Sequence, residues 1–263
     1  MTEQTTLPLA GGGALPVVGL GTWDVRGDAV YPLVRTAIDV GYRHIDTAHG
    51  YENQADIGAA LRRCGIDRDE LFLTSKIPPW QIGHERETLE ASLTGLGTDH
   101  LDLWLIHAPP DDDAASLGLW EFLIGARESG AVRDIGVSNY STAQIDALAA
   151  GTGVMPAVNQ IRWRPEIFDA QVLRECRERG IVVEGFSALR QSDLADPTLL
   201  RIARRHNVTT AQVILRWQLH HDVVALPRST RPGRIEENFA LRDFELTGEE
   251  VAVIDAMSIS LVP

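Results

Sequence analysis

The sequence feature that most constrains the fold of this chain is a repeated alternation of short apolar runs with longer amphipathic runs. Short apolar runs bounded by turn residues are typical of buried strands, whereas amphipathic runs of about ten or more residues are typical of the helices that cover them. Strands are expected at residues 17–20, 43–46, 71–76, 101–107, 135–138, 158–161, 182–187 and 223–226. Eight strand–helix units in succession predict an α/β protein, a closed (β/α)8 TIM barrel of parallel strands.

The intervening runs predict helices at residues 29–40, 53–63, 85–96, 116–128, 142–149 and 170–179, with a pair at 197–205 and 210–219. Two more are expected at 232–240 and 247–257, because Pro232 suits a first helical turn and Thr247 with Glu250 makes a capping-box pattern. Ahead of the barrel, residues 1–16 contain three successive glycines, which predict a hairpin or lid. No linker divides the chain, so residues 1–263 are expected to form a single domain with a short C-terminal extension.

The composition excludes several classes of function. Hydrophobic residues make up 44% and charged residues 23% of the chain, as in soluble globular proteins, and no apolar run approaches the roughly 20 residues of a membrane span. Cys64 and Cys176 are the only cysteines and suggest neither a disulfide framework nor a metal cluster. A net charge of -13 disfavours nucleic acid and anionic membranes as partners. Without a signal segment or an exposed apolar stripe, we expect a cytoplasmic monomer.

Residues 41–51 gather several ionisable side chains in one short stretch. His44 and Asp46 alternate along an expected strand and therefore share one face, and Tyr51 follows at the start of the next helix. An acid at a strand end and a nearby phenol predict part of a proton-transfer site. The same stretch also suits an ordinary loop in which Asp46 caps a helix and Tyr51 is half-buried.

Two further polar side chains end apolar strands, since Lys76 closes the third expected strand and His107 the fourth. In barrels of this kind the active site lies where strands end and the following loops begin. A buried lysine or histidine is costly without a partner, and Asp46 is the obvious partner for Lys76. Each residue alone could be structural, but the convergence of these side chains with Tyr51 on one rim predicts a catalytic site.

Several widely separated motifs occur in one order along nearly the whole chain. They are Gly19-Leu-Gly-Thr-Trp23, Asp46-Thr-Ala-His-Gly-Tyr-Glu-Asn53, Ser75-Lys76, Leu105-Ile-His107, Gly136-Val-Ser-Asn-Tyr140, Val158-Asn-Gln160 and Leu226-Pro-Arg-Ser229. Together these motifs resemble the aldo-keto reductase family. The resemblance implies a catalytic tetrad of Asp46, Tyr51, Lys76 and His107. It also implies that Ser138, Asn139 and Gln160 hydrogen-bond the nicotinamide carboxamide of a cofactor, and that Phe186 stacks on the nicotinamide ring.

The four residue types of this tetrad suit carbonyl reduction, which needs a hydride on carbon and a proton on oxygen. Tyr51 would be the general acid, and the ammonium group of Lys76 would lower the pKa of Tyr51. Asp46 would keep Lys76 charged and oriented, and neutral His107 would donate a hydrogen bond to the substrate oxygen. The expected function is therefore that of an NADPH-dependent oxidoreductase reducing aldehydes or ketones to alcohols.

The cofactor prediction begins with residues 19–24, a near miss to the Rossmann dinucleotide fingerprint in which Asp24 replaces the third glycine. Residues 227–238 instead follow the last strand, enter a helix and carry arginines, which suits phosphate binding. The resemblance places the adenosine end of the cofactor there, with Arg228 and Arg234 on a 2′-phosphate, so NADPH is favoured and NADH is the weaker alternative. Alternatively, these arginines lie on the surface and pair with acidic residues nearby in the sequence. The expected cofactor-binding residues are Gly21, Thr22, Trp23, Ser138, Asn139, Gln160, Phe186, Ser187, Leu189, Arg190, Pro227, Arg228, Ser229, Thr230, Arg234, Glu237 and Asn238.

The expected substrate site consists of Trp23, Tyr51, Trp80 and His107. By the resemblance, the two tryptophans line an apolar pocket for a small-molecule carbonyl substrate, although both could be core or edge residues instead. The chain stops at Pro263 without the long C-terminal loop that narrows the pocket in many relatives, so an open, shallow pocket is expected.

Two functions of other classes stay open. A metal-dependent hydrolase on the same barrel would use His44, Asp46, Lys76 and His107 as ligands, although no paired-histidine motif lies on one strand and a lysine disfavours a nearby cation. A cofactor-binding sensor would keep the fold and the site but regulate a partner protein with little turnover. The presence of all four catalytic residue types argues against lost activity.

Overall fold

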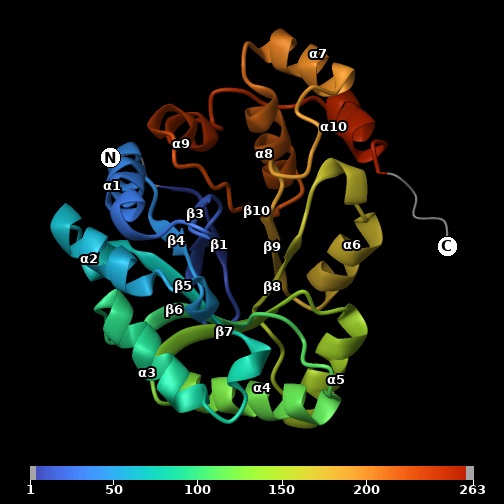
Figure 1. Cartoon of the computed structure of the whole chain (residues 1–263). Coiled ribbons are helices and arrows are strands. Elements are labelled where there is room, and N and C mark those ends of the chain that lie inside the picture. Colours follow the sequence, from blue (N-terminus) through green and yellow to red (C-terminus); the bar gives the residue numbers. More distant parts are fainter. Residues whose placement is uncertain (1–3, 259–263) are drawn as a thin grey trace.

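Eight parallel strands, hydrogen-bonded in sequence order, form the centre of the molecule (Figure 1). The computed structural model describes residues 4–258. The strands are β3 (Gly19–Gly21), β4 (His44–Asp46), β5 (Phe72–Ile77), β6 (Leu101–Ile106), β7 (Val132–Ser138), β8 (Val158–Arg162), β9 (Val182–Phe186) and β10 (Val224–Ala225). A parallel bridge between Val18 and Ala225 joins the two ends of the sheet. The sheet therefore closes on itself, and the predicted (β/α)8 barrel is confirmed.

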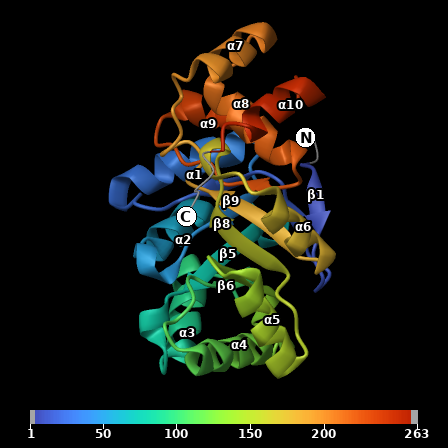
Figure 2. The same cartoon turned by 90° about the vertical axis from the view of Figure 1, so that its right-hand side faces the viewer.

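Helices follow the strands and surround the barrel (Figures 1 and 2). They are α1 (Val30–Val40), α2 (Gln54–Cys64), α3 (Glu85–Leu96), α4 (Asp113–Glu128), α5 (Thr142–Thr152), α6 (Ala170–Glu178), α7 (Pro197–His206), α8 (Thr210–His220), α9 (Pro232–Phe239) and α10 (Gly248–Asp255). Short 3-10 turns lie at η1 (Gly27–Ala29), η2 (His49–Tyr51), η3 (Arg68–Glu70), η4 (Pro79–Gln81) and η5 (Pro165–Ile167). Figure 2 shows α7, α8 and α10 at one end of the view and α3, α4 and α5 at the other.

The expected helices all occur, and their ends differ by a few residues for identifiable reasons. α4 begins at Asp113 rather than residue 116, because the side chain of Asp112 caps it by accepting hydrogen bonds from the N–H groups of Ala114 and Ala115. The capping box predicted at Thr247 and Glu250 is present and starts α10. The expected C-terminal extension includes residues 259–263, which lie outside the described part of the chain.

An antiparallel hairpin of β1 (Thr6–Pro8) and β2 (Ala14–Pro16) precedes the barrel, as the glycine run predicted. Its turn is attached to β7, because the N–H groups of Gly11 and Gly13 donate to the two carboxylate oxygens of Asp134 at 2.8 and 3.1 Å. A Cβ atom at either glycine would lie within 2.4 Å of those oxygens, so a larger residue would displace the carboxylate. Asp134 lies near the start of its strand, so the hairpin closes the end of the barrel opposite the strand ends and is not a lid over them.

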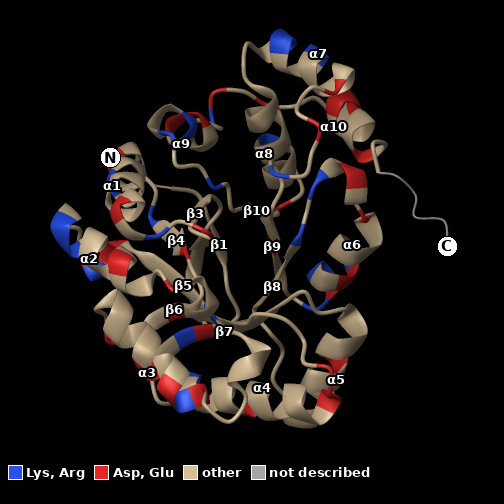
Figure 3. Ribbon diagram, viewed as in Figure 1, with Lys and Arg blue, Asp and Glu red and all other residues tan. Residues whose placement is uncertain are grey.

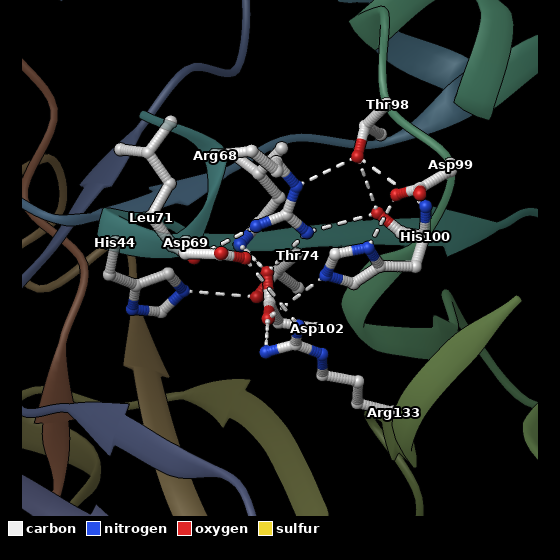
Figure 4. Close-up of polar contacts among 11 residues, drawn as sticks. His44, Arg68, Asp69, Leu71, Thr74, Thr98, Asp99, His100, Asp102 and Arg133 are labelled. Carbon is white, nitrogen blue, oxygen red and sulfur yellow. Dashed lines mark hydrogen bonds and ion pairs between the residues drawn. The ribbon is translucent and has the colours of Figure 1, made fainter. Parts of the chain in front are cut away.

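A second polar cluster lies at the strand starts, centred on the buried carboxylate of Asp102 (Figure 4). This carboxylate accepts hydrogen bonds from the Arg68 guanidinium at 2.6 Å and from the Leu73 N–H at 2.8 Å, and Arg133 lies 3.4 Å away. Arg68 also donates to the carbonyl oxygens of Leu71 and His100. The cluster therefore joins the starts of β5, β6 and β7, an end of the barrel that usually serves stability rather than catalysis.

Lys and Arg residues, and Asp and Glu residues, are distributed along the outer helices (Figure 3). The spaces between the helices and the barrel are filled by buried apolar side chains, including Trp104, Trp120, Trp163 and Trp217. Across residues 4–258, no helix has both the length and the apolar character needed to cross a membrane.

Candidate active site

A single continuous cavity of about 790 Å³ opens at the strand ends. Most of the predicted site residues line it, namely Gly21, Trp23, Asp46, Tyr51, Trp80, His107, Ser138, Asn139, Gln160, Phe186, Ser187, Leu189, Arg190, Pro227, Arg228, Ser229, Arg234, Glu237 and Asn238. Three predicted residues do not line it: Thr22, Lys76 and Thr230. Thr22 and Lys76 are fully buried behind the wall of the cavity, where Thr22 donates a hydrogen bond to the carbonyl oxygen of Asp46.

A buried ion pair lies at the base of the cavity. Lys76 on β5 and Asp46 on β4 occupy neighbouring strands, and the lysine Nζ lies 2.8 Å from each carboxylate oxygen and 2.8 Å from the carbonyl oxygen of Thr47. Burial acts to lower the pKa of Lys76, but the nearby Asp46, Tyr51 and Glu184 together raise it above its ordinary value. Lys76 therefore stays charged even though its side chain is shielded from water. The predicted Lys76–Asp46 pairing is confirmed.

Tyr51 ends the short η2 turn and presents its ring to this ion pair. The Nζ atom of Lys76 lies 5.2 Å from the centre of the Tyr51 ring. Burial raises the pKa of Tyr51 above its ordinary value, Asp46 acts in the same direction, and Lys76 opposes both. The expected influence of Lys76 is thus present, but burial outweighs it in the free protein. Tyr51 consequently holds its proton at neutral pH.

His107, just after β6, packs edge-on against Tyr51 with ring centres 5.5 Å apart. Burial and the neighbouring Lys76 lower the pKa of His107 to about 4, against a smaller opposing effect of Asp46. The imidazole is therefore neutral at pH 7, as predicted, and carries one N–H donor. Its Nδ1 atom is buried without a hydrogen-bond partner. The side chain of Asn139 donates to the backbone carbonyl of His107 at 3.3 Å, which fixes the loop that carries the ring.

The residues expected around a nicotinamide come from adjacent strands β7, β8 and β9. Asn139 adopts a left-handed backbone conformation with φ of 63°, and its N–H bonds to the carbonyl of Gln160 at 3.0 Å. Asn139 also donates to the Ser138 hydroxyl at 2.9 Å. Phe186 ends β9 beside them and faces the same cavity. The structure thus brings these four predicted residues together.

The opposite part of the cavity is bordered by arginines from separate loops. Arg228 donates to the carbonyl oxygen of Asp24 at 3.1 Å, and the guanidinium groups of Arg190 and Arg228 lie 4.4 and 5.8 Å from the centre of the Trp23 ring. Arg234, in the first turns of α9, lines the same cavity. The acids near these arginines in the sequence do not pair with Arg228, which instead has Asp24 as its acidic neighbour at 3.7 Å.

The two tryptophans expected at the substrate site are neither core nor edge-packing residues. Trp23 is 42% exposed and Trp80 is 71% exposed, and both line the cavity. Trp80 packs close to Gly50, where a Cβ atom would lie 3.2 Å from the indole ring. Both rings are therefore free to contact a molecule bound in the cavity.

Sequence reasoning missed several residues that border or support this cavity. Glu184 on β9 is fully buried, and its carboxyl group accepts a hydrogen bond from Gln160 at 2.9 Å. A charged residue within an otherwise apolar strand was the available signal. Arg162, Leu194 and residues 209–211 also line the cavity, but nothing in their local sequence marks them.

The ligand set of the metal-hydrolase alternative is not assembled. His44 lies inside the barrel with its Nε2 atom 3.0 Å from the hydroxyl of Thr74, and the Lys76 ammonium occupies both oxygens of Asp46. Within residues 4–258, no group of three or more His, Cys, Asp or Glu side chains is arranged to hold a metal ion.

A parallel barrel that combines a protonated phenol, a buried ion pair and a neutral imidazole at one end of a long, arginine-bordered cavity is typical of oxidoreductases that act on carbonyl groups with a nicotinamide cofactor. Comparison with known proteins agrees. The model of the aldo/keto reductase family matches residues 17–259, so the chain belongs to this family.

Relatives of known name cover almost the whole chain. The sequence is 40% identical to 2,5-diketo-D-gluconic acid reductase B from Corynebacterium sp. (strain SHS752001), over 98% of this chain and 94% of that protein. The fold matches an aldo/keto reductase from Brucella melitensis with a TM-score of 0.93 and 36% identity, covering 97% of this chain and all of the other. It also matches an aldo-keto reductase from Bombyx mori in complex with NADP, with a TM-score of 0.89 and 32% identity over 98% and 94% of the two chains.

Proposed function

We propose that this protein reduces small aldehydes or ketones to alcohols with NADPH, and that Tyr51 is the general acid. The observation that carries the proposal is the position of Tyr51, between the buried Lys76–Asp46 pair and an open cavity. A phenol is a weak acid, so it donates a proton efficiently only where the phenolate left behind is stabilised. Lys76, held charged by Asp46, supplies that stabilisation.

The remaining steps follow from the side chains around Tyr51. Neutral His107 donates a hydrogen bond to the carbonyl oxygen, orienting it toward the Tyr51 hydroxyl and stabilising the negative charge that develops there. Tyr51 then transfers its proton to that oxygen, and Lys76 stabilises the phenolate. NADPH, when bound, supplies the hydride that reduces the carbonyl carbon.

The side chains along the cavity fit this cofactor. Amide and hydroxyl groups of Asn139 and Ser138 lie where β7 ends beside Tyr51 and His107, and suit a carboxamide. Arg228, Arg234 and the start of α9 suit phosphate groups in a chain of net charge -13. The similarity to the Bombyx mori protein, which was solved with NADP, supports the same choice. NADH is the weaker alternative.

The open cavity with its exposed tryptophans favours small, varied carbonyl compounds over one tightly enclosed substrate. A relative named for reduction of 2,5-diketo-D-gluconic acid supports small dicarbonyl compounds as first substrates to test. Methylglyoxal and benzaldehyde are suitable probes, because neither carries a titratable group.

The test measures the rate of NADPH oxidation by absorbance, with methylglyoxal or benzaldehyde as the substrate, for the wild type and for Tyr51→Phe. The variant is expected to lose turnover by about 10²-fold or more, because the general acid is removed while the ring remains. Tyr31→Phe is the matched control, since Tyr31 lies on α1 against Arg63 and away from the cavity. Near-normal turnover of Tyr51→Phe would remove Tyr51 as the acid. NADPH binding without turnover on any carbonyl compound would favour the sensor function.

A further inference from the structure

A second carboxyl group lies inside the barrel beneath the proposed catalytic site. Glu184, on β9, is fully buried, and its Oε2 atom accepts a hydrogen bond from the Gln160 side chain at 2.9 Å. Its other oxygen, Oε1, has no hydrogen-bond partner and lies 3.8 Å from the His44 Nε2 atom. A buried carboxyl group with one unpartnered oxygen is costly, which calls for an explanation beyond packing.

Glu184 is connected to the ion pair through one amide nitrogen. The Gln160 Nε2 atom donates one N–H to Glu184 and the other to the Asp46 Oδ2 atom, each at 2.9 Å. The same Asp46 oxygen accepts a hydrogen bond from Lys76 at 2.8 Å. A chain of hydrogen bonds thus runs from Glu184 through Gln160 and Asp46 to Lys76, next to the Tyr51 ring.

The groups that face Glu184 explain its protonation state. His44 and Asp46 face it from β4, Lys76 from β5 and Gln160 from β8, while its partner in register on β10 is the apolar Val224. Burial lowers the pKa of His44 to about 4, so His44 is neutral at pH 7. Burial and Asp46 raise the pKa of Glu184 to about 8, against the opposing effects of Gln160 and Lys76. Among the groups that face Glu184, the ion pair is therefore that of Lys76 and Asp46.

We infer that Glu184 is a positioning residue for carbonyl reduction, acting through Gln160 and Asp46 on Lys76 and so on Tyr51. The inference rests on the function proposed above. While Glu184 keeps its proton, Asp46 is the only anion beside Lys76, and the lysine charge is available to stabilise the Tyr51 phenolate. When Glu184 ionises, a second negative charge in a medium of low dielectric constant opposes that phenolate and slows proton donation.

The test compares the pH dependence of kcat in the wild type and in Glu184→Gln, with saturating NADPH and benzaldehyde. The glutamine keeps an acceptor for Gln160 but does not ionise. The wild-type kcat is expected to fall severalfold as the pH rises through about 8, because Glu184 ionises there and its charge disfavours the Tyr51 phenolate. Glu184→Gln is expected to lose this decline and to retain only the one at higher pH from Tyr51. Glu178→Gln, which removes an exposed carboxylate at the end of α6, is expected to keep the wild-type profile.

A second readout does not require turnover. The pKa of Glu184 is raised on folding, so its contribution to stability is complete below its unfolded pKa of 4.5 and is lost as the pH rises through about 8. Between these values Glu184 should make the urea midpoint of unfolding fall with rising pH in the wild type. Glu184→Gln should lose the part of this pH dependence that comes from the one proton bound by Glu184. This measurement also establishes that the variant is folded.

The outcomes separate the inference from the proposed function. A wild-type decline near pH 8 that disappears in Glu184→Gln supports the inference. If Glu184→Gln keeps the decline, or if only the unfolding slope changes, Glu184 is structural and the inference is wrong, while the reductase function stands. If the wild type oxidises NADPH with neither carbonyl probe, the proposed function fails, and the inference fails with it.

Discussion

Lys76 carries an ammonium group that has three N–H donors and finds three acceptors inside the barrel. Two are the oxygens of Asp46 and the third is the carbonyl oxygen of Thr47. With every donor satisfied, the charge survives complete burial, and the low dielectric constant strengthens its effect on Tyr51. A lysine at the same position in water would have far less influence on the phenol.

The arginines of the cavity are also explained one residue at a time. Arg234 lines the cavity from α9, whereas its neighbour Arg231 does not line it and stands just before the helix. Arg234→Ala is expected to raise the Kd for NADPH about 10-fold to 100-fold, because a charge-assisted hydrogen bond to a phosphate is worth about 1.5–3 kcal/mol. The Kd for NADH, which has no 2′-phosphate, should change little.

Fluorescence titration with each cofactor checks this prediction. Arg231→Ala is the control and should leave both dissociation constants unchanged. Equal weakening of NADPH and NADH by Arg234→Ala would place Arg234 on a part that the two cofactors share, and the 2′-phosphate assignment would be wrong.

The two ends of the barrel carry different sets of polar residues. At the strand ends, β4 and β5 contribute Asp46 and Lys76 to the proposed site. At the strand starts, β6 and β7 contribute Asp102 and Asp134 to polar clusters that join loops together. Alternation along a strand also places His44 and Asp46 on the same inner face, as predicted. The proposed chemistry and the attachment of the loops therefore depend on opposite ends of the barrel.

Asp134→Ala tests the attachment of the N-terminal hairpin. The change leaves the N–H groups of Gly11 and Gly13 without their acceptor and weakens the attachment of a hairpin whose own Leu15 is fully buried. The free energy of unfolding is expected to fall by about 2–4 kcal/mol, since two hydrogen bonds to a carboxylate are lost.

Urea unfolding followed by circular dichroism measures that loss. Asp69→Ala is the matched control, because the side chain of Asp69 is 91% exposed and its distance to Arg133 is 4.0 Å, so its removal should cost under about 1 kcal/mol. If both variants unfold at the same urea concentration, the hydrogen bonds from the hairpin to Asp134 do not stabilise the protein.

At the scale of the whole molecule, the barrel interior makes stability depend on pH in two opposing ways. Burial lowers the pKa of His44 and of His107 to about 4, so each loses its contribution to stability as the pH falls from 6.5 toward 4 and the unfolded chain takes up protons. Burial raises the pKa of Glu184, so its contribution is lost in the opposite direction, as the pH rises toward 8. The summed contribution of His44, His107 and Glu184 to the free energy of unfolding should therefore be greatest near pH 6.5.

Thermal and urea unfolding between about pH 4.5 and 8 test this prediction. Each group contributes a slope of up to about 1.4 kcal/mol per pH unit within its window. His44→Gln should remove one proton's share of the acid-side slope, because glutamine keeps a polar group near Thr74 and does not titrate. An unchanged acid-side slope in His44→Gln would mean that His44 is protonated in the folded protein.

Much of this molecule could be predicted from the sequence because the evidence for it is local. Periodic apolar residues defined the eight strands, and turn and capping residues such as Pro232 and Thr247 located the helix starts. The polar residues that end buried strands, Lys76 and His107, indicated the site for the same reason. A polar side chain within an apolar run has an energetic cost that is visible without coordinates.

The tertiary structure alone decided which of these side chains meet. Gln160 reaches Asp46 across 114 residues of sequence and also binds Glu184, and Gly11 reaches Asp134 across 123 residues. The contact of Gln160 with Asp46 arises because the closed sheet brings β8 and β4, which are not neighbours, to face one another, and that of Gly11 arises because the hairpin packs against the start of β7. Periodicity determines which face of a strand a residue occupies, but the distance across the closed barrel depends on the packing of all eight strands together. The fold and the candidate residues could therefore be predicted from the sequence, whereas the hydrogen bonds that connect those residues could not.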